Sequence, residues 1–141
     1  MIEHEGKVLF TENELRCKGS GLLRLAPGFA DKLRDLRVDM DHPMIVNSAC
    51  RSKAHNESID GHPRSLHVGD EPHWPTGGCC AIDIRTHRWN GKEWIPINSW
   101  YRDVLIEVAW DLGWSIGYGA SFLHLDRRID YTALKQAEFN Y

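Results

Sequence analysis

The chain has 141 residues and a net charge of -3, and its composition of 42% hydrophobic and 26% charged residues suits one globular domain with its own core. It carries no basic block or arginine-rich stripe, which argues against a nucleic-acid binder. No apolar run approaches the roughly 20 residues of a membrane-spanning helix, and the acidic N-terminus lacks an apolar signal core. We expect a monomer that is made in the cytoplasm without a signal peptide.

The first part of the chain predicts two helices and a strand. Thr11 followed three residues later by Glu14 forms a capping-box pattern, which predicts a short helix. Pro27 opens a longer helix, whose apolar residues recur at helical spacing on one face. The residues on that face are Phe29, Leu33, Leu36 and Met40. The run 44–49 is typical of a buried strand, and the polar, turn-rich residues 51–64 favour a loop with room for one helical turn.

The middle of the chain predicts a strand and a hairpin. Residues 79–84 form an apolar run of strand length. The pair Asn90-Gly91 lies between two candidate strands, which predicts a hairpin near residues 84–97 with a type I′ turn.

The last part of the chain predicts a helix, two strands and a short terminal helix. Ser99 is a suitable N-cap and Gly113 a suitable residue just beyond the helix end. Residues 114–118 and 122–125 predict two closing strands, and a short helix follows from Asp130. Because short turns join the last strands, we predict an α+β fold over residues 1–141, with a mainly antiparallel central sheet and flanking helices.

Metal-ligand side chains occur beside three of these predicted strands. His67 precedes one strand, Asp83 interrupts an apolar strand, and His124 lies among large apolar residues with Asp126 on its own face. A carboxylate in an apolar strand is costly unless it is paired or metal-bound. Two imidazoles and one carboxylate suit Zn²⁺ with a fourth position for water. For each residue alone, a hydrogen-bonded core residue is the more frequent explanation, so spacing does not establish a metal site.

Five short motifs follow one another in a fixed order: Asn47–Ser52, His55-Asn56, Ser65–His67, Ala81–Asp83 and Phe122–Arg127. Together they resemble the M15 peptidases, the D-alanyl-D-alanine carboxypeptidase and dipeptidase group that includes phage L-alanyl-D-glutamate endolysins. The resemblance covers nearly the whole chain, from about residue 10 to residue 127, and is strongest to short single-domain phage and prophage members.

The resemblance implies an M15/hedgehog-like single domain with zinc-dependent hydrolysis of peptide bonds in bacterial peptidoglycan stem peptides. Such a phage or prophage lytic enzyme would act as a carboxypeptidase or endopeptidase, after it reaches the cell wall by a separate route. The resemblance also implies residue roles. His67, Asp83 and His124 match the zinc ligands, Arg51 matches the arginine that faces the substrate carbonyl and stabilises the oxyanion, and Ser65 matches a substrate contact.

Two features depart from the family's pattern. Residues 68–80 separate the first two ligands more widely than in relatives, which predicts an insertion that loops out beside the site. Ser121 stands where many relatives carry a catalytic acid, so Asp126 is the nearest carboxylate that could serve as the base. Asp126 could equally orient a ligand histidine or pair with a neighbouring arginine. The alternative function is therefore a non-catalytic peptidoglycan-binding module that retains the metal site.

The chain contains four cysteines, Cys17, Cys50, Cys79 and Cys80. Synthesis in the cytoplasm favours free thiols over disulfides. Their spacing lacks the Cys-x-x-Cys pattern of structural zinc sites, so we expect small buried residues.

Overall fold

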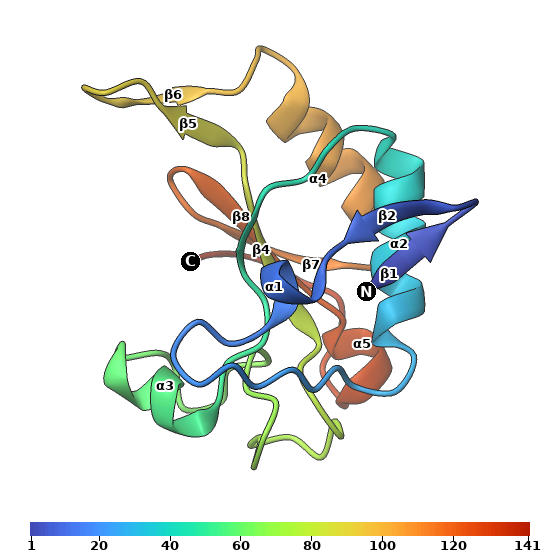
Figure 1. The fold of residues 1–141 in the computed structure, drawn as a ribbon, viewed down its shortest axis with the longest axis vertical. Coiled ribbons are helices and arrows are strands. Elements are labelled where there is room, and N and C mark those ends of the chain that lie inside the picture. The colour runs from blue at the N-terminus through green and yellow to red at the C-terminus, as the bar shows by residue number, and fades with distance from the viewer.

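A five-stranded sheet in the order β3-β4-β8-β7-β9 forms the centre of the computed structural model, which describes residues 1–141 (Figure 1). Its strands are β3 (Val46–Ser48), β4 (Ala81–Arg85), β8 (Phe122–Asp126), β7 (Ser115–Tyr118) and β9 (Glu138–Asn140). All neighbours pair antiparallel except β7 and β9, which run parallel. The predicted α+β fold with a mainly antiparallel sheet is confirmed.

Two helices, α2 (Phe29–Met40) and α4 (Tyr101–Asp111), pack against each other beside the sheet (Figure 1). The four apolar residues predicted to share one face of α2 are all buried in the core. Within this core, the rings of Phe29 and Trp114 meet edge to face with their centroids 5.7 Å apart. The two helices therefore cover the apolar face of the sheet and leave its other face for polar side chains.

Alternation along β4 and β8 separates core residues from polar residues. The side chains that join the apolar core are Ile82, Ile84, Leu123 and Leu125. The intervening positions hold Asp83 on β4, and His124 and Asp126 on β8. Asp83 and His124 are direct cross-strand partners in the register of the two strands. Strand pairing alone thus places two of the predicted ligands side by side.

The helix ends confirm some predicted caps and correct one. Helix α1 (Glu12–Leu15) begins with a complete capping box between Thr11 and Glu14. Gly113, just beyond α4, has the positive φ of 94° that favours glycine. The prediction that Ser99 caps α4 is wrong. Helix α4 begins at Tyr101, so Trp100 is its N-cap residue and its side chain makes no capping hydrogen bond. The side chain of Asn98 instead accepts hydrogen bonds from the amides of Trp100 and Tyr101.

A separate two-stranded hairpin joins β5 (His87–Trp89) to β6 (Trp94–Pro96). The predicted type I′ turn is wrong, because Trp89 pairs with Trp94 and leaves a four-residue loop over residues 90–93. The side chain of Asn90 caps this loop, because its Oδ1 accepts hydrogen bonds from the amides of Lys92 and Glu93. Gly91 supplies the positive φ that the loop requires.

Several short elements complete the chain. They are the antiparallel pair β1 (Ile2–His4) and β2 (Lys7–Phe10), helix α3 (Lys53–Ser58) and helix α5 (Arg128–Tyr131). The first pair and strand β9 were not predicted. Residues 69–80 contain no helix or strand, although an isolated bridge joins Cys79 to Leu25. None of the helices combines the length and apolar character needed to cross a membrane.

Candidate metal centre

Three buried side chains converge on the polar face of the sheet. Oδ1 of Asp83 lies 3.0 Å from Nε2 of His67 and 2.9 Å from Nδ1 of His124, and the two ring nitrogens are 3.2 Å apart. His67 reaches the sheet from the segment after α3, where its carbonyl accepts a hydrogen bond from the amide of Arg51 at 2.9 Å. The predicted ligands, distant in sequence, therefore form one cluster.

The hydrogen bonds of the two imidazoles determine which nitrogen carries each ring proton. Nδ1 of His67 lies 2.6 Å from the carbonyl oxygen of Ala49, and Nε2 of His124 lies 2.8 Å from Oδ2 of Asp126. Both partners are acceptors, so these two nitrogens donate. In the neutral rings, the remaining nitrogens turn their lone pairs towards the carboxylate of Asp83. The lone pairs of Nε2 of His67, Nδ1 of His124 and Oδ1 of Asp83 therefore point at one another and repel. An added proton or a metal cation would relieve this repulsion.

The spacing of the three donor atoms suits a small divalent cation. Ligands held about 2.0–2.1 Å from a tetrahedral zinc lie roughly 3.3 Å from one another. The three observed separations, from 2.9 to 3.2 Å, are close to that value. Each ligand histidine also has an acceptor for its second nitrogen, as is usual for imidazoles that bind metals. The residues present therefore fit a metal ion with two nitrogen donors and one oxygen donor.

The local electrostatics favour the metal-binding forms of two of the ligands. Burial lowers the pKa of His67, although the charge of Asp83 acts in the opposite direction. Burial also opposes ionisation of Asp83, but the two imidazoles outweigh it and hold the pKa of this carboxyl below its usual range. For His124, burial is outweighed by the carboxylates of Asp126 and Asp83, which raise its pKa. The raised pKa favours the protonated form of His124, and protonation of this imidazole competes with metal binding.

Arg51 is fixed beside the cluster by three partners. Its Nε donates to Oγ of Ser48 at 3.2 Å, Nη1 to Oδ1 of Asn56 at 3.2 Å, and Nη2 to Oδ2 of Asp83 at 3.5 Å. Only 8% of the residue is exposed. Asn56 is held in turn, because its Nδ2 donates to the carbonyl of His62 at 3.0 Å. The guanidinium is thus held rigidly next to a ligand carboxylate, at the wall of a pocket.

Asp126 uses both of its carboxylate oxygens. Oδ2 accepts from His124 and from Nη2 of Arg128, and Oδ1 accepts from the amide and Nε of Arg128. Burial raises the pKa of Asp126, but the hydrogen bonds from Arg128 and His124 outweigh it and lower the pKa to about 2. The carboxylate stays ionised and tied to His124 at neutral pH.

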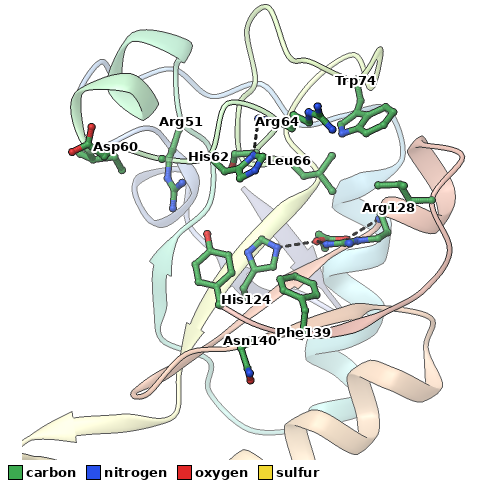
Figure 2. Close-up of a pocket in the computed structure, with 16 residues that line it drawn as sticks. Arg51, Asp60, His62, Arg64, Leu66, Trp74, His124, Arg128, Phe139 and Asn140 are labelled. Carbon is green, nitrogen blue, oxygen red and sulfur yellow. Dashed lines mark hydrogen bonds and ion pairs between the residues drawn. The ribbon is translucent and has the colours of Figure 1, made fainter.

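A pocket of about 720 Å³ opens onto His124 and Arg51 (Figure 2). Asp126 also lines this pocket. Ser65 lines it and accepts a hydrogen bond from the amide of His67 at 3.2 Å. Trp74, from the segment predicted to be an insertion, also lines it. That segment therefore contributes to the pocket wall. Its neighbour His73 is exposed and contacts the Trp74 ring.

Two aromatic residues of the C-terminal segment complete the pocket, and neither was predicted from the sequence. The ring of Tyr141 stacks on His124 with centroids 4.6 Å apart and an interplanar angle of 12°, and Phe139 lies 5.8 Å from the same imidazole. Gly117 of β7 leaves room for them, since a Cβ there would lie 2.8 Å from Phe139 and 3.0 Å from Tyr141. The sequence did contain a signal for a strand here, because Phe139 and Tyr141 are two residues apart and residues at this spacing share one face of a strand.

The fold and the cluster define an α+β protein with a candidate divalent-metal centre in a pocket. A sequence model of the family Peptidase M15 matches residues 8–103, about two thirds of the chain. The chain belongs to the M15 peptidases, a family of metalloenzymes, which supports peptidase activity. The matched segment includes Arg51, Ser65, His67 and Asp83, whereas His124 lies beyond it. No curated protein matches the chain.

Proposed function

We propose that the protein is a zinc-dependent peptidase that hydrolyses peptide bonds in bacterial peptidoglycan stem peptides. It would serve as a phage or prophage lytic enzyme that acts on the cell wall after release by a separate route. The observation that carries this proposal is the convergence of three lone pairs, from His67, Asp83 and His124, next to the fixed guanidinium of Arg51.

Each residue of the site has a role that follows from its contacts. His67, Asp83 and His124 would hold zinc, which when bound polarises a carbonyl group and lowers the pKa of water. Arg51, already held by three partners, would face the negative charge that develops on the carbonyl oxygen without having to reorganise. Ser65, on the pocket wall, would contact the substrate.

For Asp126, the hydrogen bonds favour the orienting role over that of base. A general base works best when its pKa is near the working pH. The pKa of Asp126 is about 2, and both of its oxygens already accept hydrogen bonds from His124 and Arg128. We therefore propose that Asp126 holds the ring of His124 in the tautomer that presents Nδ1 to the metal.

The pocket suits a peptide that carries carboxylate groups, as stem peptides do. Three arginines line it, Arg51, Arg64 and Arg128, together with the apolar side chains of Trp74 and Phe139. Arginine pairs with carboxylates through two parallel hydrogen bonds. Of these arginines, Arg64 is exposed and its side chain makes no hydrogen bond within the protein, so it is free to bind a substrate.

Zinc analysis and a cleavage assay on purified stem peptides test the proposal. The wild type is expected to bind close to one equivalent of zinc and to cleave the peptide, with the cut bond identified by mass spectrometry. His124→Ala should lose both properties, whereas His73→Ala, which alters an exposed histidine outside the cluster, should keep both. Zinc-loaded protein that cleaves no stem peptide of any wall type would contradict the proposal.

The alternative is a non-catalytic module that binds peptidoglycan and retains the metal. Ser121 favours it, because this residue stands at the family's acid position and cannot accept a proton from water as a carboxylate does. In this case zinc-loaded wild type and Asp126→Asn would bind the stem peptide equally and neither would cleave it. Turnover by the wild type eliminates the alternative.

A further inference from the structure

Two cysteine thiols touch each other in the core beside the metal centre. The Sγ atoms of Cys50 and Cys79 are 2.7 Å apart, and the two residues are 2% and 0% exposed. A covalent bond between two sulfurs is about 2.05 Å long, so a shift of less than 1 Å separates this contact from a disulfide. All four cysteines are free and buried, as expected from the sequence, and two of them are in contact.

The main chain holds both cysteines in this position. The amide of Cys50 donates to the carbonyl of Leu15 at 2.9 Å, and the amide of Cys79 donates to the carbonyl of Arg24 at 2.8 Å. The carbonyl of Cys79 accepts from the amide of Ala26 at 2.9 Å. The thiol of Cys50 also donates to the Arg24 carbonyl, at 3.4 Å. Three hydrogen-bonded segments thus bring the two sulfurs together, and the contact does not depend on a mobile loop.

We propose that Cys50 and Cys79 are a modification site at which a peroxide oxidises the two thiols to a disulfide. This inference does not depend on the peptidase activity. The bond would join the residue just before Arg51 to the segment that leads into β4, the strand that carries Asp83.

The chemistry needs one small two-electron oxidant. The thiolate of Cys50 attacks hydrogen peroxide, forms a sulfenic acid and releases hydroxide. The sulfur of Cys79 then attacks the sulfenic sulfur, the disulfide forms, and the oxygen leaves as water. In sum, two thiols and one peroxide give one disulfide and two waters. The hydrogen bond from Cys79 lowers the pKa of Cys50, and burial raises the pKa of Cys79, so within this pair Cys50 ionises before Cys79.

The other two cysteines lack a thiol partner. Cys80 follows Cys79 directly, but burial and the nearby charge of Asp126 raise its pKa to about 12. Cys17 contacts Ser52, whose hydroxyl lies 3.8 Å from its sulfur and whose amide donates to it at 3.3 Å. Oxidation should therefore link one specific pair out of the four cysteines.

The disulfide would enclose residues 51–78 in a covalent ring. This ring contains Arg51, Ser65 and His67, together with the pocket wall around Trp74. A cross-link over a loop of this length restricts the unfolded chain, and we expect the oxidised protein to melt about 10 °C higher than the reduced protein.

Peptide mapping of the full-length protein tests the proposal. The folded protein is treated with hydrogen peroxide, unfolded, alkylated and digested, and the fragments are identified by mass spectrometry. We expect a cross-linked fragment pair that contains Cys50 and Cys79, alkylation of Cys17 and Cys80 only, and full reversal by dithiothreitol. Four alkylated cysteines after peroxide treatment, a different linked pair, or sulfinic acid without a cross-link would overturn the proposal.

Two variants separate the cross-link from general oxidation. Cys79→Ala should lose both the cross-linked fragment and the rise in melting temperature, whereas Cys80→Ala, its buried neighbour, should keep both. The fragment map of the wild type decides the question even if the Cys79→Ala variant does not fold. An equal rise in melting temperature for Cys79→Ala and the wild type would also overturn the proposal.

Discussion

Nε2 of His124 donates a hydrogen bond of 2.8 Å to Oδ2 of Asp126, two residues further along the same strand. The partner fixes the tautomer of the imidazole, so that Nδ1 faces His67 and Asp83. Metal affinity in such sites depends on the group that accepts a hydrogen bond from the ligand histidine as well as on the histidine itself.

Asp126→Asn is expected to bind zinc about 10- to 100-fold more weakly than the wild type, since an amide no longer fixes the ring proton. Competition with a chromophoric chelator measures the affinity. Activity should recover at saturating zinc, if Asp126 only orients His124. Unchanged zinc affinity together with lost activity would instead identify Asp126 as the base.

Asp126 should also contribute a pH-dependent part of the stability of the metal-free protein. Its pKa is about 2 in the folded protein and about 3.9 in an unfolded chain, so the unfolded state binds the proton first. The stabilisation, about 2 kcal/mol, is therefore complete above about pH 5 and is lost as the pH falls through 4 towards 2. Urea unfolding of the wild type and Asp126→Asn in chelator measures it.

The difference in unfolding free energy between these two proteins should shrink as the pH falls. Asp39→Asn, which alters an exposed carboxylate on α2, is the control and should show no such trend. A difference between the wild type and Asp126→Asn that stays constant from neutral to acidic pH would contradict the assignment.

Arg51→Lys should lower kcat by about 100- to 1,000-fold while the zinc content remains that of the wild type. Lysine keeps the charge but cannot make the three directed hydrogen bonds that hold the guanidinium in place. Steady-state cleavage of a stem peptide provides the rate. Arg64→Lys, which changes an exposed arginine of the same pocket, should alter KM more than kcat. Equal effects of the two substitutions on kcat would argue against a special role for Arg51.

Gly117→Ala tests the packing of the C-terminal aromatic residues on His124. The added Cβ would lie 2.8 Å from Phe139, 3.0 Å from Tyr141 and 3.1 Å from Cβ of His124. We expect a loss of about 1–3 kcal/mol in unfolding free energy, as is typical of overpacking, together with weaker zinc binding. Urea unfolding measures the first effect.

A second substitution shows whether the clash is the cause. Phe139→Leu removes the nearest ring atom, so the double variant Gly117→Ala/Phe139→Leu should lose less stability than the sum of the two single variants. Strict additivity would mean that the alanine acts through the backbone of β7 and not through the ring of Phe139.

Local signals in the sequence were sufficient for features that depend on neighbouring residues. The capping box of Thr11 and Glu14, the apolar face of α2 and the glycine after α4 were all correctly predicted, because each depends on contacts within a few residues. The predicted cap of α4 was wrong because Trp100, not Ser99, is the N-cap residue of the helix. Helix α4 begins at Tyr101, one residue later than an N-cap at Ser99 would require, and the side chain of Asn98 accepts hydrogen bonds from the amides of Trp100 and Tyr101.

The candidate ligands were chosen from the order of motifs, and the sequence by itself determined which side chains could bind a metal. Only the tertiary structure decided how they meet. The register of β4 and β8 places Asp83 opposite His124. A main-chain hydrogen bond from Arg51 holds His67 beside them, and Tyr141, which follows β9, stacks on the imidazole of His124. These relations join residues far apart in the chain, and their energies depend on distances that no local pattern contains. The contact between Cys50 and Cys79 has the same origin, because it is formed by two segments that meet only in the folded core.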